Sequence, residues 1–71
     1  MKEQDLDKYV GCIVIITDFE KEKNCGLLYK IKDGIVYRNG QKEFHSISNG
    51  YFLEGKNIDY RKSHIKKIEI I

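Results

Sequence analysis

The sequence predicts a small all-β domain. The prediction rests on the excess of strand-favouring residues, on the chain length and on the positions of the turns. Residues that favour strands outnumber residues that favour helices. The chain contains eleven Ile, three Val, five Tyr, three Phe and one Thr, but only four Leu and no Ala. Four of the six Gly follow Asp, Asn or Glu, and they divide the chain into short segments at hairpin spacing. With 71 residues there is material for one core, so we expect residues 1–71 to form a single domain. A helical bundle and a two-domain enzyme are excluded.

The first third begins with a polar lead-in over residues 1–9, whose apolar residues have the spacing of one or two helical turns. The most hydrophobic strand is expected over residues 10–17. Its apolar residues do not alternate, which indicates burial on both faces or a sharp bend. Residues 18–25 alternate in charge and are expected to form a charged, solvent-exposed loop.

The middle of the chain is expected to fold as a hairpin around Gly34. A three-residue loop pairs Ile31 with Ile35 and Tyr29 with Tyr37, and so gathers the apolar side chains on one face. A two-residue turn divides these side chains between the two faces, so the three-residue loop is preferred.

A second hairpin is expected at Asn39–Gly40, a sequence typical of two-residue turns. It places Phe44 opposite Ile35 on the same apolar face. Short strands follow over residues 51–53 and 58–60. The alternation breaks at Arg61–His64, which predicts one helical or 3₁₀ turn, and resumes in a last strand over residues 65–71.

This layout of a strand, a long loop, three hairpin-linked strands, a single turn and a last strand resembles an SH3-like barrel. The resemblance implies a five-stranded, bent antiparallel barrel with the short turn near residues 61–64. A fainter likeness to the Sm-like fold lies in Tyr9–Gly11, Gly26–Leu28 and Tyr60–Lys62. Lys62 stands where that fold has Gly, and its RNA-binding Asp and Asn have no match here, so recognition of uridine-rich RNA is not carried over.

The segments Asp5–Gly11 and Tyr60–Ile65, within a likeness over the whole length, resemble the YorP family of small proteins from bacilli and their prophages. Membership implies five strands with one short helix between two of them. It implies a phage or prophage origin and assigns no function.

Residue types that carry out catalysis or bind metals are scattered along this chain. Cys12, Cys25, His45 and His64 have no recognised metal-binding spacing. Ser46 and Ser48 lie near His45, but turn formation before Asn49–Gly50 explains them. No glycine-rich phosphate loop is present. We therefore expect a protein that is not an enzyme and has no cofactor and no bound metal.

Charge is the sequence feature that points to a binding partner. The net charge is +2, and residues 56–67 hold five Lys or Arg against one Asp. The candidate binding residues are this basic C-terminal edge together with two aromatic residues: Arg61, Lys62, His64, Lys66, Lys67, Tyr60 and Phe19. The absence of Trp argues against a proline-rich ligand.

Two functions remain open at this point. The first is a small binding module for a host or phage protein. The alternative is weak nucleic-acid binding through the basic edge, with Tyr51, Phe52 and Tyr60 as stacking surfaces unless they belong to the core. The longest continuous apolar run has four residues and the N-terminus is polar, so we expect no membrane association and a cytoplasmic location. A monomer or a weak homodimer is expected.

Overall fold

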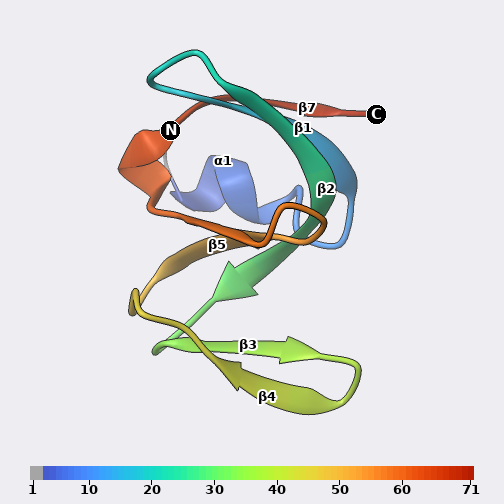
Figure 1. Cartoon of the computed structure of the whole chain (residues 1–71), viewed down its shortest axis with the longest axis vertical. Helices are drawn as coiled ribbons and strands as arrows, with labels where there is room; N and C mark the ends of the chain where they lie inside the picture. The colour runs from blue at the N-terminus through green and yellow to red at the C-terminus, as the bar shows by residue number, and fades with distance from the viewer. Residues whose placement is uncertain (1–2) are drawn as a thin grey trace.

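The computed structural model describes residues 3–71, and it confirms the all-β prediction (Figure 1). Within these residues there are seven strands, one short α-helix and one 3₁₀ helix. In chain order they are α1 (Glu3–Asp7), β1 (Ile13–Asp18), β2 (Lys23–Ile31), β3 (Ile35–Arg38), β4 (Gln41–Phe44), β5 (Gly50–Leu53), β6 (Ile58–Tyr60), η1 (Lys62–His64) and β7 (Ile65–Ile70).

Five strands form one antiparallel sheet in the order β6-β5-β2-β1-β7, and β3 and β4 form a separate two-stranded sheet. The predicted number of five strands is therefore wrong, because the β3–β4 hairpin adds a second sheet. No ladder joins β6 to β7 in the described part of the chain, so the large sheet is not a closed barrel. Figure 1 shows β1 and β2 curving around α1, with the hairpin at the opposite end of the molecule.

The first strand starts later than predicted. Gly11 has a φ of 89°, in the left-handed region, and the Cys12 N–H donates to the Tyr9 carbonyl over 3.0 Å. These turns replace the first residues of the predicted strand, so β1 begins at Ile13. The helical lead-in is confirmed as α1, whose Leu6 is fully buried.

The predicted charged loop is present but shorter than residues 18–25: it spans residues 19–22, which are exposed, because β1 ends at Asp18 and β2 begins at Lys23. Cys25 pairs with Ile15 of β1 in the antiparallel ladder. The connection is closed by Asp18, whose carboxylate accepts the backbone N–H groups of Glu20 and Glu22 at 2.9 and 3.0 Å. Alternating charges here mark an exposed strand end and a tight turn.

The predicted pairing of Ile31 with Ile35 is also wrong. Asp33 and Gly34 both have positive φ, and the hydrogen-bonded pair is Lys32 with Ile35, as in a two-residue turn. The partner of β2 is β5, and Ile31 lies opposite Gly50. Because β2 forms its hydrogen bonds with β5 and not with β3, the apolar faces of β2 and β3 do not have to align.

The second turn, at Asn39–Gly40, is confirmed with its register, since Ile35 lies opposite Phe44. The face that carries these residues is only partly covered, however: Ile35 is half-buried and Phe44 is 82% exposed. The opposite face of the hairpin supplies Val36 to a small core cluster with Ile31 and Phe52.

The main core lies between α1 and the concave side of the large sheet. Its buried members are Leu6, Val14, Ile16, Leu28, Tyr51, Leu53, Tyr60, Ile65 and Ile68. The predicted turn before the last strand is confirmed as η1, and β7 then returns beside β1. No helix within residues 3–71 combines the length and apolar character needed to cross a lipid bilayer.

Candidate functional site

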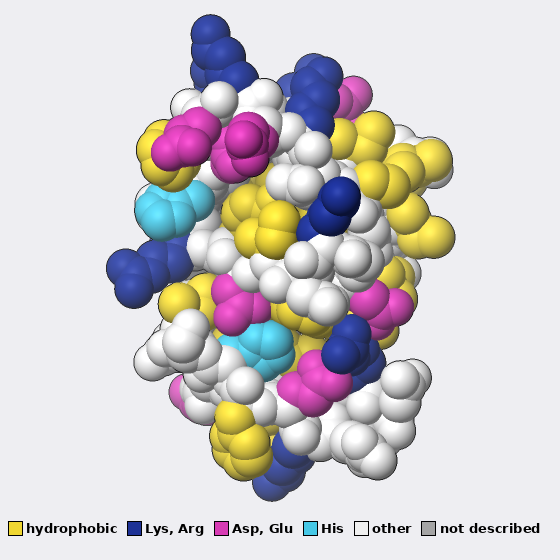
Figure 2. All heavy atoms as spheres, in the orientation of Figure 1, with side chains coloured by type: hydrophobic (Ala, Val, Ile, Leu, Met, Phe, Trp, Pro, Cys, Tyr) yellow, Lys and Arg dark blue, Asp and Glu magenta, His cyan; other side chains and the backbone are white. Residues whose placement is uncertain are grey.

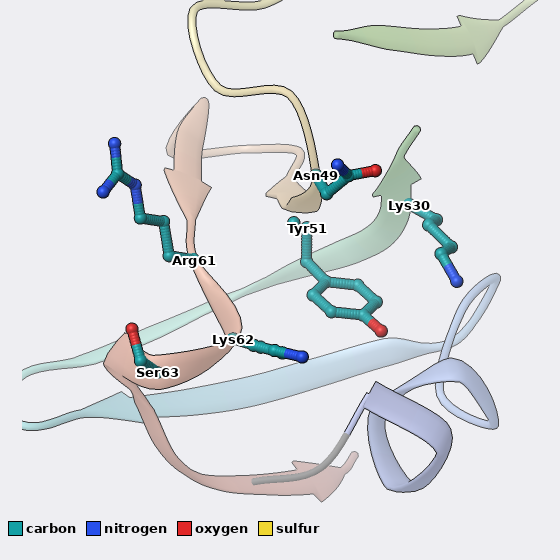
Figure 3. Close-up of a pocket in the computed structure, with 7 residues that line it drawn as sticks. Lys30, Asn49, Tyr51, Arg61, Lys62 and Ser63 are labelled. Carbon is teal, nitrogen blue, oxygen red and sulfur yellow. The ribbon is translucent and has the colours of Figure 1, made fainter. Parts of the chain in front are cut away.

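A cleft of about 400 Å³ lies where β2, the start of β5 and the segment around η1 meet (Figure 3). Its lining residues are Lys30, Asn49, Gly50, Tyr51, Arg61, Lys62 and Ser63. Three of them are cationic, and none of the described lining residues is acidic. The lining side chains therefore carry ammonium, guanidinium, amide and hydroxyl groups.

Tyr51 connects the cleft to the core. Its ring is buried in the main cluster, and its hydroxyl donates a hydrogen bond to the Asp7 carboxylate of α1. The Lys30 ammonium donates to the other oxygen of Asp7 over 2.8 Å. Asp7 thus fixes two of the lining side chains and docks α1 against β2 and β5.

Arg61 and Lys62 approach the cleft from its other side. Arg61 follows β6 and caps η1, since its carbonyl accepts the His64 N–H over 2.8 Å. In Figure 3 the Lys62 side chain extends toward Tyr51, whereas the Arg61 guanidinium points away from it. Both side chains are exposed, so an anionic ligand can reach them from solvent.

The carboxyl group of Asp7 has a pKa lowered from its usual value. The hydrogen bond from Lys30 is the largest cause, and that from Tyr51 is the second. A lowered pKa in the folded state means that Asp7 stabilises the fold while it is ionised. This stabilisation is complete above the unfolded pKa of about 3.9 and is lost as the pH falls through the lower, folded pKa.

Asp7→Asn is expected to lower the free energy of unfolding near neutral pH by about 1 kcal/mol or less, because the partly exposed carboxylate is screened by water. At about pH 2.5, where Asp7 loses its charge, the difference in free energy of unfolding between Asp7→Asn and the unmodified protein should become smaller. What remains is the effect of replacing a neutral carboxyl group by an amide. Urea unfolding at the two pH values measures it. Asp33→Asn, in an exposed turn, is the matched control and should change the free energy of unfolding near neutral pH by less than about 0.5 kcal/mol. A deficit in Asp7→Asn that is equal at both pH values would contradict the assigned role.

The predicted basic edge is divided by the structure. Arg61 and Lys62 lie in the cleft, whereas Lys66 and Lys67 lie on β7 outside its lining, and Lys67 pairs with Glu69 at 3.6 Å.

The predicted aromatic residues also separate. Phe19 is 59% exposed and packs on His64 with 5.1 Å between ring centres. Tyr60 is only 4% exposed, its hydroxyl accepts a hydrogen bond from Asn24, and burial raises its pKa. Tyr51 and Phe52 are also buried. Phe19 is thus the exposed one of the four aromatic residues considered for stacking.

Lys30 and Asn49 were missed by the sequence analysis. They reach the cleft because β2 and β5 pair, a contact between segments that are far apart in the chain. The break in the apolar–polar alternation at Arg61–His64 indicated only the side of the cleft that is formed by the segment around η1.

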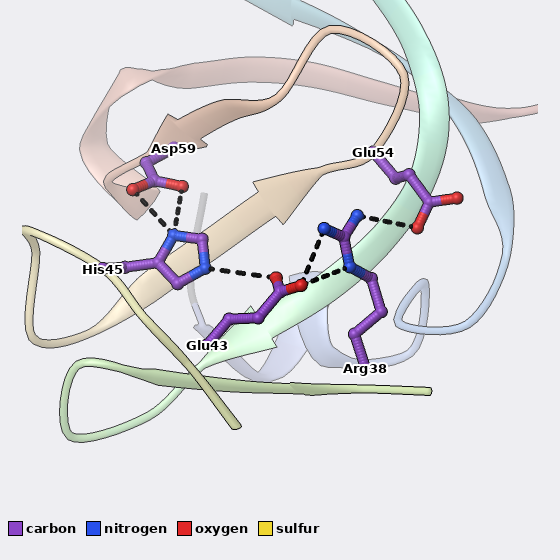
Figure 4. A network of polar contacts seen from close by, with 5 residues as sticks. All are labelled: Arg38, Glu43, His45, Glu54 and Asp59. Carbon is purple, nitrogen blue, oxygen red and sulfur yellow. Dashed lines mark hydrogen bonds and ion pairs between the residues drawn. The ribbon is translucent and has the colours of Figure 1, made fainter. Parts of the chain in front are cut away.

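A second polar cluster links the β3–β4 hairpin to the large sheet (Figure 4). Arg38 donates two hydrogen bonds to Glu43 at 2.8 and 2.9 Å and one to Glu54 at 3.0 Å. His45 Nδ1 lies 2.8 Å from Asp59, while its Nε2 is buried, has no hydrogen-bond partner in the described part of the protein, and lies 3.9 Å from the Glu43 carboxylate (Figure 4). Since Nε2 is out of reach of solvent, this imidazole is placed to hold the hairpin rather than to meet a substrate.

Residues 3–71 contain no group of three or more His, Cys, Asp or Glu side chains placed to hold a metal ion. No protein-family model matches the chain, and neither a curated protein nor a solved structure is significantly similar to it.

Proposed function

We propose that this protein is a small, non-enzymatic binding module whose cleft accepts an acidic segment of a protein partner. The observation that carries the proposal is that three cationic residues, Lys30, Arg61 and Lys62, line one cleft together with Asn49 and Ser63. The Lys62 side chain extends toward Tyr51, and the Arg61 guanidinium lies outside at the rim (Figure 3). Carboxylates form their strongest hydrogen bonds with such cationic donors. The nearby Asp7 carboxylate pairs with the Lys30 ammonium at 2.8 Å and holds it at the edge of the cleft.

A protein ligand is favoured over the alternative, weak nucleic-acid binding through Arg61, Lys62, Lys66 and Lys67. Single-stranded nucleic acids are commonly held by bases stacked on exposed aromatic rings, and Tyr51, Phe52 and Tyr60 are buried. On the face in Figure 2 the basic side chains stand apart, with acidic side chains among them. This face therefore offers no continuous basic track for a phosphate backbone.

We further propose that the architecture is an open relative of the SH3-like barrel. The order β6-β5-β2-β1-β7, with η1 before a last strand that returns beside the first, supports this. In this proposal the β3–β4 hairpin is an insertion between the second and third strands of the five. Membership of the YorP family, a prophage origin and a cytoplasmic location stay predictions.

Binding of an acidic peptide tests the proposed function. The probe is a fluorescein-labelled peptide of alternating Glu and Ser, compared by fluorescence anisotropy with the same peptide carrying Gln for Glu. The double variant Arg61→Gln/Lys62→Gln is expected to weaken binding of the acidic peptide at least about tenfold, through the loss of about 1.4 kcal/mol or more from two charge-assisted contacts.

The matched control is Lys42→Gln/Lys56→Gln, which removes the same charge at exposed positions outside the cleft. It should change the affinity less than about threefold, because distant surface charges are screened by salt. Equal weakening by the two double variants, or equal binding of the acidic and the Gln peptides, would contradict the proposal. Tighter binding of a single-stranded oligonucleotide than of the acidic peptide would replace it with the nucleic-acid alternative.

A further inference from the structure

One face of the β3–β4 hairpin carries two exposed aromatic rings. Ile35 lies opposite Phe44 and Tyr37 lies opposite Lys42, so these four side chains share one face, which we call the outer face. Phe44 is 82% exposed, Tyr37 is 65% exposed and Ile35 is half-buried. Figure 1 places the hairpin at the end of the molecule that lies away from β1 and β7. Both rings are therefore open to a ligand from solvent.

The acidic side chain of these two strands is turned to the other face. Glu43 lies opposite Val36, which is buried. The Glu43 carboxylate accepts two hydrogen bonds from Arg38, which also donates to Glu54 of the segment after β5. This cluster lies between the hairpin and the large sheet (Figure 4). Consequently no carboxylate of β3 or β4 lies on the outer face.

Two cations remain with the exposed rings. Lys42 is the cross-strand partner of Tyr37, and Lys32 joins the same face through its bridge to Ile35. Both lysines are exposed, and within residues 3–71 neither forms an ion pair. Asp33, in the turn next to Lys32, is the acidic residue at the border of this face. The outer face therefore keeps a net positive charge beside its two rings.

This combination matches the chemistry of a single-stranded nucleic acid. Unpaired bases stack on exposed aromatic side chains, and the phosphates bind ammonium groups. Tyr37 and Phe44 belong to neighbouring cross-strand positions, about 7 Å apart, so each ring can take a separate base. An apolar protein surface would cover the rings but would leave both lysines without a counter-charge. The charge of the outer face thus favours a polyanion.

We propose that the outer face of the β3–β4 hairpin binds single-stranded nucleic acid, with Tyr37 and Phe44 stacked on bases and Lys32 and Lys42 on phosphates. This surface is separate from the basic C-terminal edge, where Tyr60 is buried. None of the residues that line the cleft belongs to β3 or β4. The inference therefore does not depend on the proposed function.

Fluorescence anisotropy with a labelled oligodeoxythymidine of about ten nucleotides, at about 50 mM salt, tests the stacking. Tyr37→Ser/Phe44→Ser should weaken binding at least about tenfold, because two bases lose their rings. Tyr37→Phe keeps the ring and should stay within about threefold of the unmodified protein. Phe19→Ser is the matched control, since it removes an exposed ring beside the basic edge, and it should also stay within about threefold. Circular dichroism checks that each variant is folded.

The salt dependence of the affinity tests the two lysines. In Lys32→Gln/Lys42→Gln, the slope of log affinity against log salt should become shallower by about one, since each phosphate contact to a single strand contributes about 0.7. Arg61→Gln/Lys62→Gln makes the same charge change in the cleft lining and should leave the affinity for the oligonucleotide within about threefold.

Four results would overturn the proposal. The first is no binding below about 1 mM. The second is an equal loss of affinity in the ring variant Tyr37→Ser/Phe44→Ser and in Phe19→Ser, which would place the oligonucleotide on the basic edge. The third is a sedimentation mass of twice 8.4 kDa that the ring variant abolishes, which would assign the outer face to a second copy. The fourth is loss of acidic-peptide binding in the ring variant with oligonucleotide binding kept, which would assign the face to a protein.

Peptide and oligonucleotide binding can be assigned separately. The ring variant should bind the acidic peptide as tightly as the unmodified protein does, because the cleft lies outside the hairpin. Oligonucleotide binding that is lost in the ring variant and kept in Arg61→Gln/Lys62→Gln belongs to the hairpin and leaves the result for the cleft unchanged.

Discussion

Gly26→Ala is expected to unfold most of the protein or to leave it only marginally folded. A Cβ atom at this position of β2 would lie 1.7 Å from the Glu54 carbonyl oxygen and 2.9 Å from its carbon. These are backbone atoms, and the adjoining Glu54 N–H is held by the Leu27 carbonyl at 2.9 Å. The neighbouring backbone must therefore shift, at a cost of about 3 kcal/mol or more. A domain of this size has a total stability of only about 5 kcal/mol.

Circular dichroism during urea unfolding measures this loss. Cys25→Ala is the matched control, because it changes the adjacent residue of the same strand at an exposed site. We expect the control to lower the free energy of unfolding by less than about 0.5 kcal/mol. If Gly26→Ala were as stable as Cys25→Ala, the close approach of β2 to the end of β5 would be wrong.

Arg38→Ala is expected to release the β3–β4 hairpin from the large sheet. The guanidinium donates to both Glu43 and Glu54, and these carboxylates raise the pKa of Arg38. It also lies over the Phe52 ring, 5.1 Å from its centre. Removing the cation leaves the Glu43 and Glu54 carboxylates without this donor, so we expect the hairpin to open more readily than the large sheet.

Hydrogen exchange localises the effect of this variant. Backbone amides of β3 and β4 should exchange up to about tenfold faster, while amides of β1 and β2 change less. Lys42→Ala removes a cation from the exposed face of the same hairpin and should have little effect on either group. Equal acceleration in all strands would show that Arg38 supports the whole fold rather than the attachment of the hairpin.

Features decided by local chemistry could be predicted from the sequence. Asn39–Gly40 favours a two-residue turn wherever the flanking strands pair, and its register was correct. The turn near η1 was visible because the alternation stops at Arg61 and resumes after His64. In both cases a few adjacent residues contain the information.

Features decided by distant contacts could not be predicted. The pairing of β2 with β5 places Ile31 opposite Gly50, where a Cβ atom would lie 2.4 Å from the Tyr60 carbonyl oxygen. Gly50 is needed for this approach of backbones, yet in the sequence it has the form of a turn residue after Asn49. The prediction assumed that β2 and β3 share one apolar face, and it therefore chose a three-residue loop at Asp33–Gly34 where the chain forms a two-residue turn.

The candidate site shows the same division. Arg61 and Lys62 were identified from the cluster of positive charge, which is a local property of the sequence. Lys30 joins them only through the sheet, and Tyr51 faces the core and the cleft at once. The rest of the predicted basic edge, Lys66 and Lys67, lies on β7 outside the cleft lining.

Nuclear magnetic resonance can map where an acidic peptide binds on this protein. The isotope-labelled protein is titrated with the peptide of alternating Glu and Ser, and the backbone amide shifts are followed. We predict that the largest changes fall on the cleft lining, at Lys30, Asn49–Tyr51 and Arg61–Ser63. Changes confined to β7 or to the β3–β4 hairpin, with these residues unmoved, would contradict the claim that the cleft is the binding site.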